Sequence, residues 1–281
     1  MEQLTQDRND AWAEHAAQVS EAKRRLDESP GQVAWLRWQE VRRSVGVFQR
    51  NAAELLAVLN AGESDQELIP ELFQNVRPPL VRDEYFARLD QRLHNTLAAA
   101  VSLVDHTRRL VNEYEGTGFA EKFGPRNEAV RSADSSVFVR DLRNYLLHYG
   151  QASFVTHVRL PDAGTEGDLI SEIRIDGSTL LRWSKWSAGS RAFIEASGAE
   201  LLLTAAIRSY VDAMTDLYSW VFEQFEVLDG NDIDATNALV RELNLTMTGG
   251  ASDGTDWPER VASMEAQLRD RRDREQQADS R

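Results

Sequence analysis

An arginine, an amide and a histidine lie close together in the stretch Arg143-Asn144-Tyr145-Leu146-Leu147-His148. Cleaving RNA without a metal requires a base that takes the 2′-hydroxyl proton and an acid that protonates the leaving oxygen. Histidine suits either role because an imidazole titrates near neutrality. A guanidinium stays protonated and can hold a phosphate while charge builds on it. An asparagine amide can orient either group, so Arg143, Asn144 and His148 are candidate catalytic residues.

The spacing of apolar residues predicts that this stretch belongs to a helix over about 135–149, ended by Gly150. One face of that helix is apolar and is expected to enter the core; it carries Phe138, Leu142, Tyr145, Leu146 and Tyr149. Asn144 and His148 are four residues apart and therefore neighbours on the helix surface, and Arg140 continues their polar stripe. Arg143 lies roughly 140° around the helix from His148, so the two need not meet within one chain.

Leu147 points away from the apolar face, which favours a second subunit that covers this side of the helix. Singly exposed leucines are also common on monomers. The motif itself has a simpler interpretation as well. An arginine five positions before a histidine occurs by chance in many helices, and His148 would then be an ordinary surface or interface residue.

The segment resembles the active-site signature of the HEPN superfamily, in which an arginine, often followed directly by a polar residue, precedes a histidine by a spacer of four to six residues. Here Asn144 follows Arg143, and the spacer before His148 is of that length. The apolar setting of the motif is also similar to that of the family. The resemblance extends over about residues 83–227, where long helices are expected before and after the motif.

The resemblance implies a metal-independent endoribonuclease that needs no cofactor and acts as a homodimer, with two motifs facing one cleft. In this interpretation His148 is the general acid or base, Arg143 holds the phosphate and Asn144 orients the reacting groups. Arg140 and Tyr149 are candidate substrate-binding residues. RNA would be the substrate, and an antitoxin or regulatory protein would fit a role as a toxin or in antiviral defence. The alternative is a non-catalytic helical module that binds a protein or nucleotide partner, because some family members have lost activity.

The whole sequence predicts a mainly α fold, a HEPN-like helical bundle with a small antiparallel β-hairpin insertion. Helices are expected over about 6–28, 32–60, 83–114, 135–149, 191–227 and 233–245. Alternating apolar residues predict two or three short strands between 153 and 183, whereas 119–134 looks looser because of Gly124-Pro125. Three segments are expected: N-terminal helices in 1–80 that pack on the core, the bundle in 81–230, and acidic helices with a disordered tail in 231–281.

Composition excludes several classes of site. The chain has no cysteine, which rules out disulfides and thiolate ligands, and its histidines are too scattered for a metal site. Its net charge of −14 disfavours a general nucleic-acid coat protein. Half of the excess acid lies between Glu223 and Asp256, whereas 126–160 is mildly basic. The polar N-terminus and the absence of a long apolar run lead us to expect a cytoplasmic protein without a membrane span.

Overall fold

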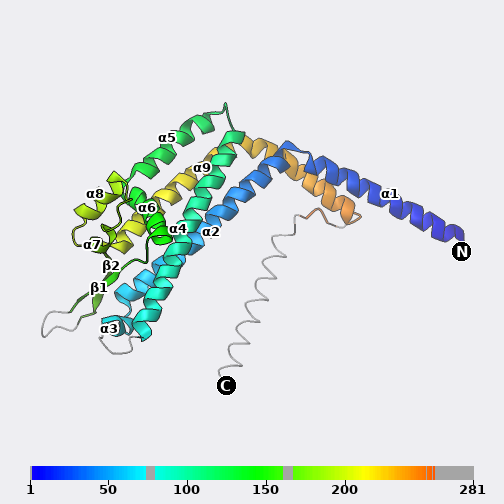
Figure 1. The fold of residues 1–281 in the computed structure, drawn as a ribbon. Coiled ribbons are helices and arrows are strands. Elements are labelled where there is room, and N and C mark those ends of the chain that lie inside the picture. The colour runs from blue at the N-terminus through cyan, green and yellow to red at the C-terminus, as the bar shows by residue number, and fades with distance from the viewer. Residues whose placement is uncertain (1, 74–79, 161–166, 251, 255, 257–281) are drawn as a thin grey trace, which may run out of the picture. The chain divides into compact units, whose positions relative to one another are not determined.

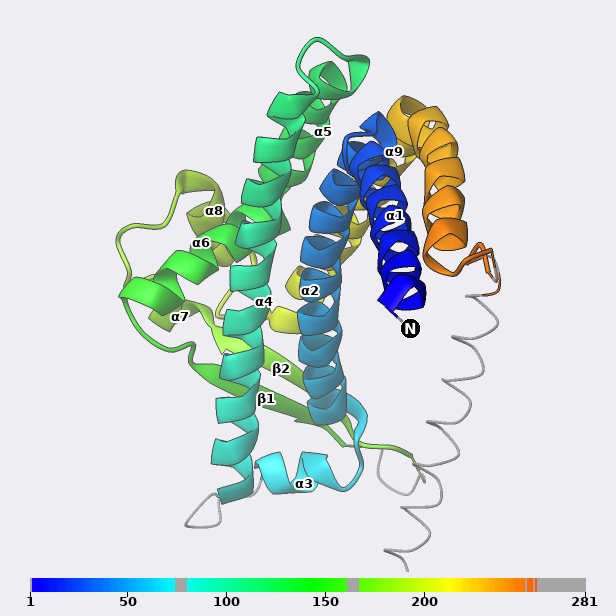
Figure 2. The same ribbon diagram turned by 90° about the vertical axis from the view of Figure 1, so that its right-hand side faces the viewer.

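The computed structural model describes residues 2–73, 80–160, 167–250, 252–254 and 256 of the 281-residue chain. These residues form a mainly helical fold with one small antiparallel sheet, which confirms the predicted fold class (Figures 1 and 2). No helix in this described part of the chain is long and apolar enough to span a membrane.

The chain divides into two compact units, and the larger one comprises residues 39–224. Its elements are most of α2 (Pro30–Ser64), α3 (Leu68–Phe73), α4 (Leu80–Glu113), α5 (Gly118–Ser132), α6 (Asp134–His148), β1 (Phe154–Arg159), β2 (Ile170–Asp176), α7 (Gly177–Leu180), α8 (Ala188–Ala196), β3 (Glu200–Leu202) and the first part of α9 (Leu203–Met247). The long helices present apolar stripes at helical spacing, as α4 does with buried Leu89, Leu93, Leu97 and Leu103. Burial of these stripes against one another forms the core of the unit.

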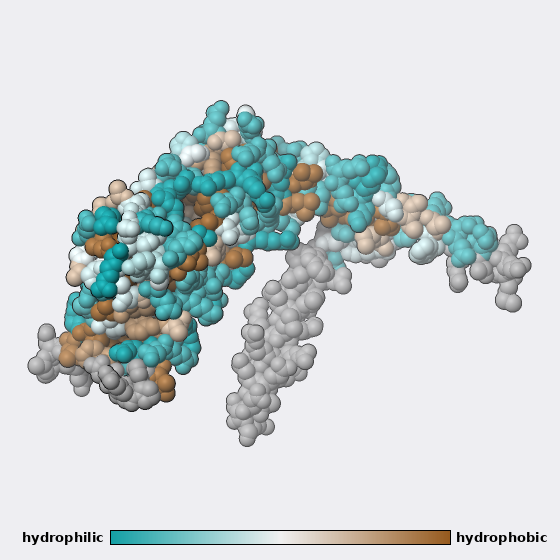
Figure 3. All heavy atoms as spheres, in the orientation of Figure 1, coloured by the Kyte–Doolittle hydropathy of each residue, from teal (hydrophilic) through white to brown (hydrophobic). Residues whose placement is uncertain are grey.

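The sheet has the strand order β1-β2-β3, and both pairings are antiparallel. Phe154 pairs with Ile175 at one end of the hairpin and Arg159 with Ile170 at the other. Alternate residues of β2 are buried, among them Ile173 and Ile175, so one face of the sheet covers the helices. Hydrophobic atoms remain exposed at the end of this unit that carries β1, β2 and α3 (Figure 3).

The smaller unit comprises the described residues of 1–38 and 225–281. It contains α1 (Glu2–Asp27), the start of α2 and the second half of α9. Gly31 lies so close to α9 that a β-carbon there would come within 2.1 Å of the Asp232 carbonyl oxygen, and only glycine permits this approach. Trp38 stacks on Phe225 at a ring distance of 5.8 Å and donates a 3.0 Å hydrogen bond to Asp229.

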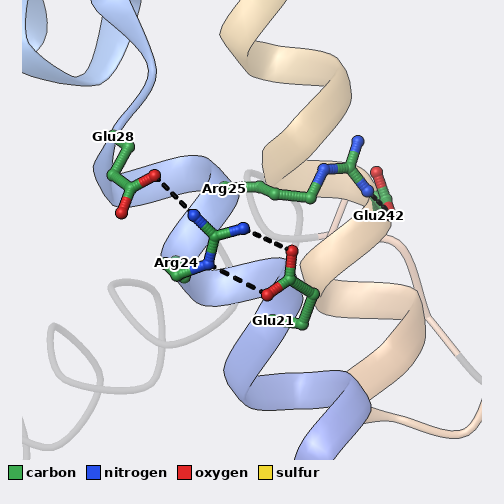
Figure 4. A network of polar contacts seen from close by, with 5 residues as sticks. All are labelled: Glu21, Arg24, Arg25, Glu28 and Glu242. Atoms are coloured by element: carbon green, nitrogen blue, oxygen red, sulfur yellow. Dashed lines mark hydrogen bonds and ion pairs between the residues drawn. The ribbon is translucent and has the colours of Figure 1, made fainter.

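An ion pair links α1 to α9 within this smaller unit, beside a second pair of contacts at the end of α1 (Figure 4). Arg25 of α1 reaches Glu242 of α9 at 2.6 Å. Arg24 pairs with Glu21 in the same helix and with Glu28 just after it. All of these side chains are about half exposed, so water and salt screen the pairs, which then contribute little stability.

Three sequence predictions about the helices were wrong. Residues 118–132 form the regular helix α5 despite Pro125, because Thr117 caps its first turn and the buried side chains of Phe119, Phe123 and Asn127 recur every four residues. The helix expected over 191–227 is interrupted by Gly198, whose φ of +80° ends α8 before β3 begins. The break expected at Asn231-Asp232 is absent, and α9 runs on through it to Met247.

The two units are divided differently from the three consecutive segments expected from the sequence. The larger unit is the continuous stretch 39–224, whereas the smaller one combines residues from both ends of the chain, because α2 and α9 each contribute residues to both units. Most of the tail expected to be disordered, residues 257–281, lies outside the described residues.

Candidate functional site

Helix α6, which carries the predicted motif, is held by aromatic side chains on its buried face. Tyr145 is 1% exposed and stacks on Trp186 at a ring distance of 5.5 Å. Trp183 lies edge-on to both rings. Phe138, about two turns before Tyr145 on α6, also stacks on Trp186 and so extends the cluster. Trp183 and Trp186 are therefore core residues and are not available for stacking on bases.

Asp141 fixes α6 to the beginning of α8, which lies beside it in Figures 1 and 2. Its carboxylate accepts hydrogen bonds from the Ser187 backbone N–H at 3.1 Å and from the Ser190 hydroxyl at 2.7 Å. Ser187 is the N-cap of α8, so a negative charge here also faces the positive end of the helix dipole. Gly189 allows the two helices to come close, since a β-carbon there would lie 3.2 Å from Val137.

The C-terminal end of α6 and the residue that follows it carry an exposed strip that consists of Asn144, Leu147, His148 and Tyr149. Tyr149 was expected to enter the core, but it lies just past the last residue of α6 and is half exposed. His148 is exposed, Leu147 and Tyr149 are each 50% exposed, and Asn144 is half-buried. No hydrogen bond or ion pair engages the imidazole of His148 within the described part of the chain. The Tyr149 ring packs on Tyr145 at 5.2 Å and on Trp183 at 6.5 Å, and half of the residue remains open to solvent.

Arg143 points away from this strip, into a pocket between α4, α5, α6 and α9. The pocket has a volume of about 140 Å³, and Arg140 and Arg143 line it together with Arg108 and Arg131. The Nε atom of Arg143 is buried and has no hydrogen-bond partner among the described residues. His148 and Asn144 do not line the pocket.

The structure thus brings the predicted residues together in two places. Asn144 and His148 share the exposed strip with Tyr149, whereas Arg143 belongs to the pocket. Arg140 lines the pocket, yet 40% of its side chain is exposed, so it is the predicted residue best placed to serve both places. The angular separation of Arg143 from His148 on the helix accounts for this division.

Sequence reasoning missed several residues of these two places. Ser136, Tyr210, Arg108 and Arg131 line the pocket, and Asp141 positions α6. Their roles depend on neighbours from other helices, so no local pattern announces them. The one available signal was Asp141, an acidic residue near the middle of an amphipathic helix whose neighbours one turn before and after, Val137 and Tyr145, are apolar or aromatic.

Two tyrosines near the site are neutral at ordinary pH. Burial raises the pKa of Tyr145, and the neighbouring Tyr149 adds to this effect while Arg182 partly offsets it. Burial also raises the pKa of Tyr210 to about 12, although the charge of Arg140 acts in the opposite direction. Both phenols can therefore donate a hydrogen bond. Among the described residues, no cluster of three histidines or carboxylates is arranged to hold a metal ion.

Comparison of the chain with protein-family models, with curated proteins and with solved structures gives no match.

Proposed function

We propose that this protein is a metal-independent endoribonuclease of HEPN type, with His148 on α6 as its general acid or base. The observation that carries the proposal is the exposure of His148 next to Asn144, on a strip of α6 that no described residue of the chain covers. An imidazole that is open to solvent and free of ion pairs can reach the 2′-hydroxyl or the leaving oxygen of an RNA strand.

The reaction is a transesterification within the RNA. A base removes the 2′-hydroxyl proton, the 2′-oxygen attacks the adjacent phosphorus, and the bond from phosphorus to the 5′-oxygen breaks. An acid then protonates that 5′-oxygen, which leaves a 2′,3′-cyclic phosphate and a 5′-hydroxyl. Arg140 or Arg143 would stabilise the charged phosphate, and the open part of the Tyr149 ring would stack on a neighbouring base.

Two copies of the chain would complete such a site. A single His148 supplies either the base or the acid, whereas two copies that face each other across α6 supply both. Leu147 and Tyr149 favour this arrangement, because each leaves half of a large apolar side chain exposed beside His148. An antitoxin or regulatory protein would then be expected to cover the same strip.

The test is cleavage of single-stranded RNA by the purified protein in the presence of EDTA. We expect 2′,3′-cyclic phosphate ends from the parent protein and a loss of about a hundredfold or more in rate for His148→Ala, the usual contribution of acid–base catalysis. His15→Ala, a half-buried histidine of α1, is the matched control and should cleave like the parent. Equal rates for parent and His148→Ala would overturn the proposal.

A non-catalytic helical module that binds a protein or nucleotide partner is the second candidate. The observation that favours it is the position of Arg143, which turns into the pocket and leaves no arginine of the motif itself beside His148. The net charge of −14 also weakens attraction for RNA. This candidate predicts no RNA cleavage under any condition, together with retained binding of its partner by His148→Ala.

A further inference from the structure

The pocket between α4, α5, α6 and α9 combines an apolar interior with a positively charged lining, and all of its residues belong to the larger unit. Its volume of about 140 Å³ is close to that of cavities known to hold a single benzene ring, roughly 150 Å³. Val101, Val104, Val139 and Met214 supply apolar walls. These walls therefore suit an apolar body of that size.

The charges of the lining are not balanced within the pocket. Four arginines line it, and Asp105 is its one acidic residue. Arg108 pairs with Asp105 at 3.3 Å, and Arg131 and Arg140 each lie within 4 Å of an acidic residue outside the pocket. The side chain of Arg143 has no ion pair or hydrogen bond among the described residues. Its guanidinium is therefore free to bind an anion.

Two buried polar atoms in this lining lack partners, which native proteins usually avoid. Ser136 is 3% exposed, and its hydroxyl has no hydrogen-bond partner among the described residues. The Nε atom of Arg143 is likewise buried and has no hydrogen-bond partner among the described residues. Tyr210, which is 9% exposed, adds a neutral phenol to the same wall. A hydroxyl, a phenol and a guanidinium around one small space are the groups that hold a carboxylate or a phosphate.

We propose that this pocket binds a small organic anion, with its acidic group held by Arg143, Ser136 and Tyr210 and its compact apolar body between α4 and α9. Inorganic phosphate alone would leave the apolar walls unfilled, and a neutral compound of the same shape would leave the guanidinium unpaired. This site goes beyond the ribonuclease proposal. Arg143 enters both proposals, but His148, the acid or base of the ribonuclease, lies outside the pocket, so anion binding does not require cleavage.

The test is calorimetric titration of the full chain with benzoate and phenyl phosphate, beside inorganic phosphate and neutral benzyl alcohol. We expect both organic anions to bind and benzyl alcohol to bind at least about tenfold more weakly, the usual effect of losing hydrogen bonds to a charged group. Failure of both anions to bind would overturn the proposal, as would equal affinity for benzyl alcohol. Tighter binding of inorganic phosphate than of either organic anion would also refute an apolar body.

Variants locate the site. Arg143→Met should reduce benzoate affinity by about tenfold or more, whereas Arg191→Met in α8, which removes an equally charged and 40% exposed arginine, should leave it unchanged. Ser136→Ala tests the hydroxyl without adding bulk, and Ser136→Leu should block the pocket altogether. Unchanged affinity in both Arg143→Met and Ser136→Leu would overturn the proposal.

The same titration separates the ribonuclease proposal from the pocket proposal. His148→Ala should bind benzoate like the parent even though RNA cleavage is lost. Benzoate binding without RNA cleavage would refute the ribonuclease proposal and support the anion site. RNA cleavage without benzoate binding would support the ribonuclease proposal and refute the anion site.

Discussion

Replacing Asp141 by alanine is expected to loosen α8 from α6 and to destabilise the unit that carries the candidate site. The Asp141 carboxylate is 13% exposed and accepts two hydrogen bonds from the beginning of α8, at 3.1 Å from Ser187 and 2.7 Å from Ser190. Ser190 is fully buried, so water does not readily replace the lost partner. In the variant, the Ser187 hydroxyl still donates to the Ser190 hydroxyl at 3.1 Å, so the Ser190 side chain is not left entirely without a partner.

The expected loss follows from these contacts. A hydrogen bond to a charged group contributes about 1.5 kcal/mol at the lower end of its range, so the two together contribute about 3 kcal/mol to the free energy of unfolding. The favourable position of the carboxylate at the start of α8 adds roughly 0.5 kcal/mol. The melting temperature should then fall by about 7–14 °C, given the response of about 2–4 °C per kcal/mol for a domain of this size.

Urea denaturation followed by tryptophan fluorescence measures this loss. Trp186 is a suitable reporter because it packs against Tyr145 and Phe138 of α6. Asp212→Ala, at an exposed position of α9, is the matched control and should change stability by no more than about 0.5 kcal/mol. Asp141→Asn keeps one acceptor and should fall between the two. A loss for Asp141→Ala no greater than that of the control would refute the reasoning.

Three further changes probe the assembly, the pH dependence and the packing. Leu147→Glu should weaken a homodimer, because it puts a charge on the exposed strip, and an unaltered sedimentation profile would count against two copies meeting there. Hydrogen bonds from Ser178 and Thr179 hold the pKa of Asp176 at about 2, below the pKa of about 4 that the carboxyl has in the unfolded chain. The carboxylate therefore stabilises the fold above about pH 4, and this stabilisation is lost as the pH falls towards 2. Urea titrations should show the stability gap between the parent and Asp176→Ala shrinking over that range, and a constant gap would contradict it. Gly62→Ala should lower the melting temperature even though alanine favours helices, since the added carbon would lie 2.1 Å from the Tyr85 hydroxyl oxygen, and a rise in melting temperature would show that this contact relaxes freely.

The sequence alone determined which segments of this protein form most of its helices and where the hairpin lies. Apolar spacing predicted a helix over 83–114, close to the observed Leu80–Glu113, and one over 135–149, close to Asp134–His148. Alternation likewise located the two strands of the hairpin. These features are local, because a helix or strand that must bury one face repeats its apolar residues with the period of its own geometry. The angle between Arg143 and His148 on α6 follows from the same periodicity.

Only the tertiary structure decided what surrounds each of those side chains. Arg143 enters a pocket whose other walls come from α4, α5 and α9, and Asp141 finds its partners in α8, 46 and 49 residues further along the chain. The unbroken course of α9 past Gly230 also depends on packing, since α2 approaches it closely at Gly31. Helical periodicity fixes the direction in which a residue leaves its own helix. Whether it meets solvent, a carboxylate or an apolar wall depends on distant segments, whose arrangement is set by the packing of the whole core.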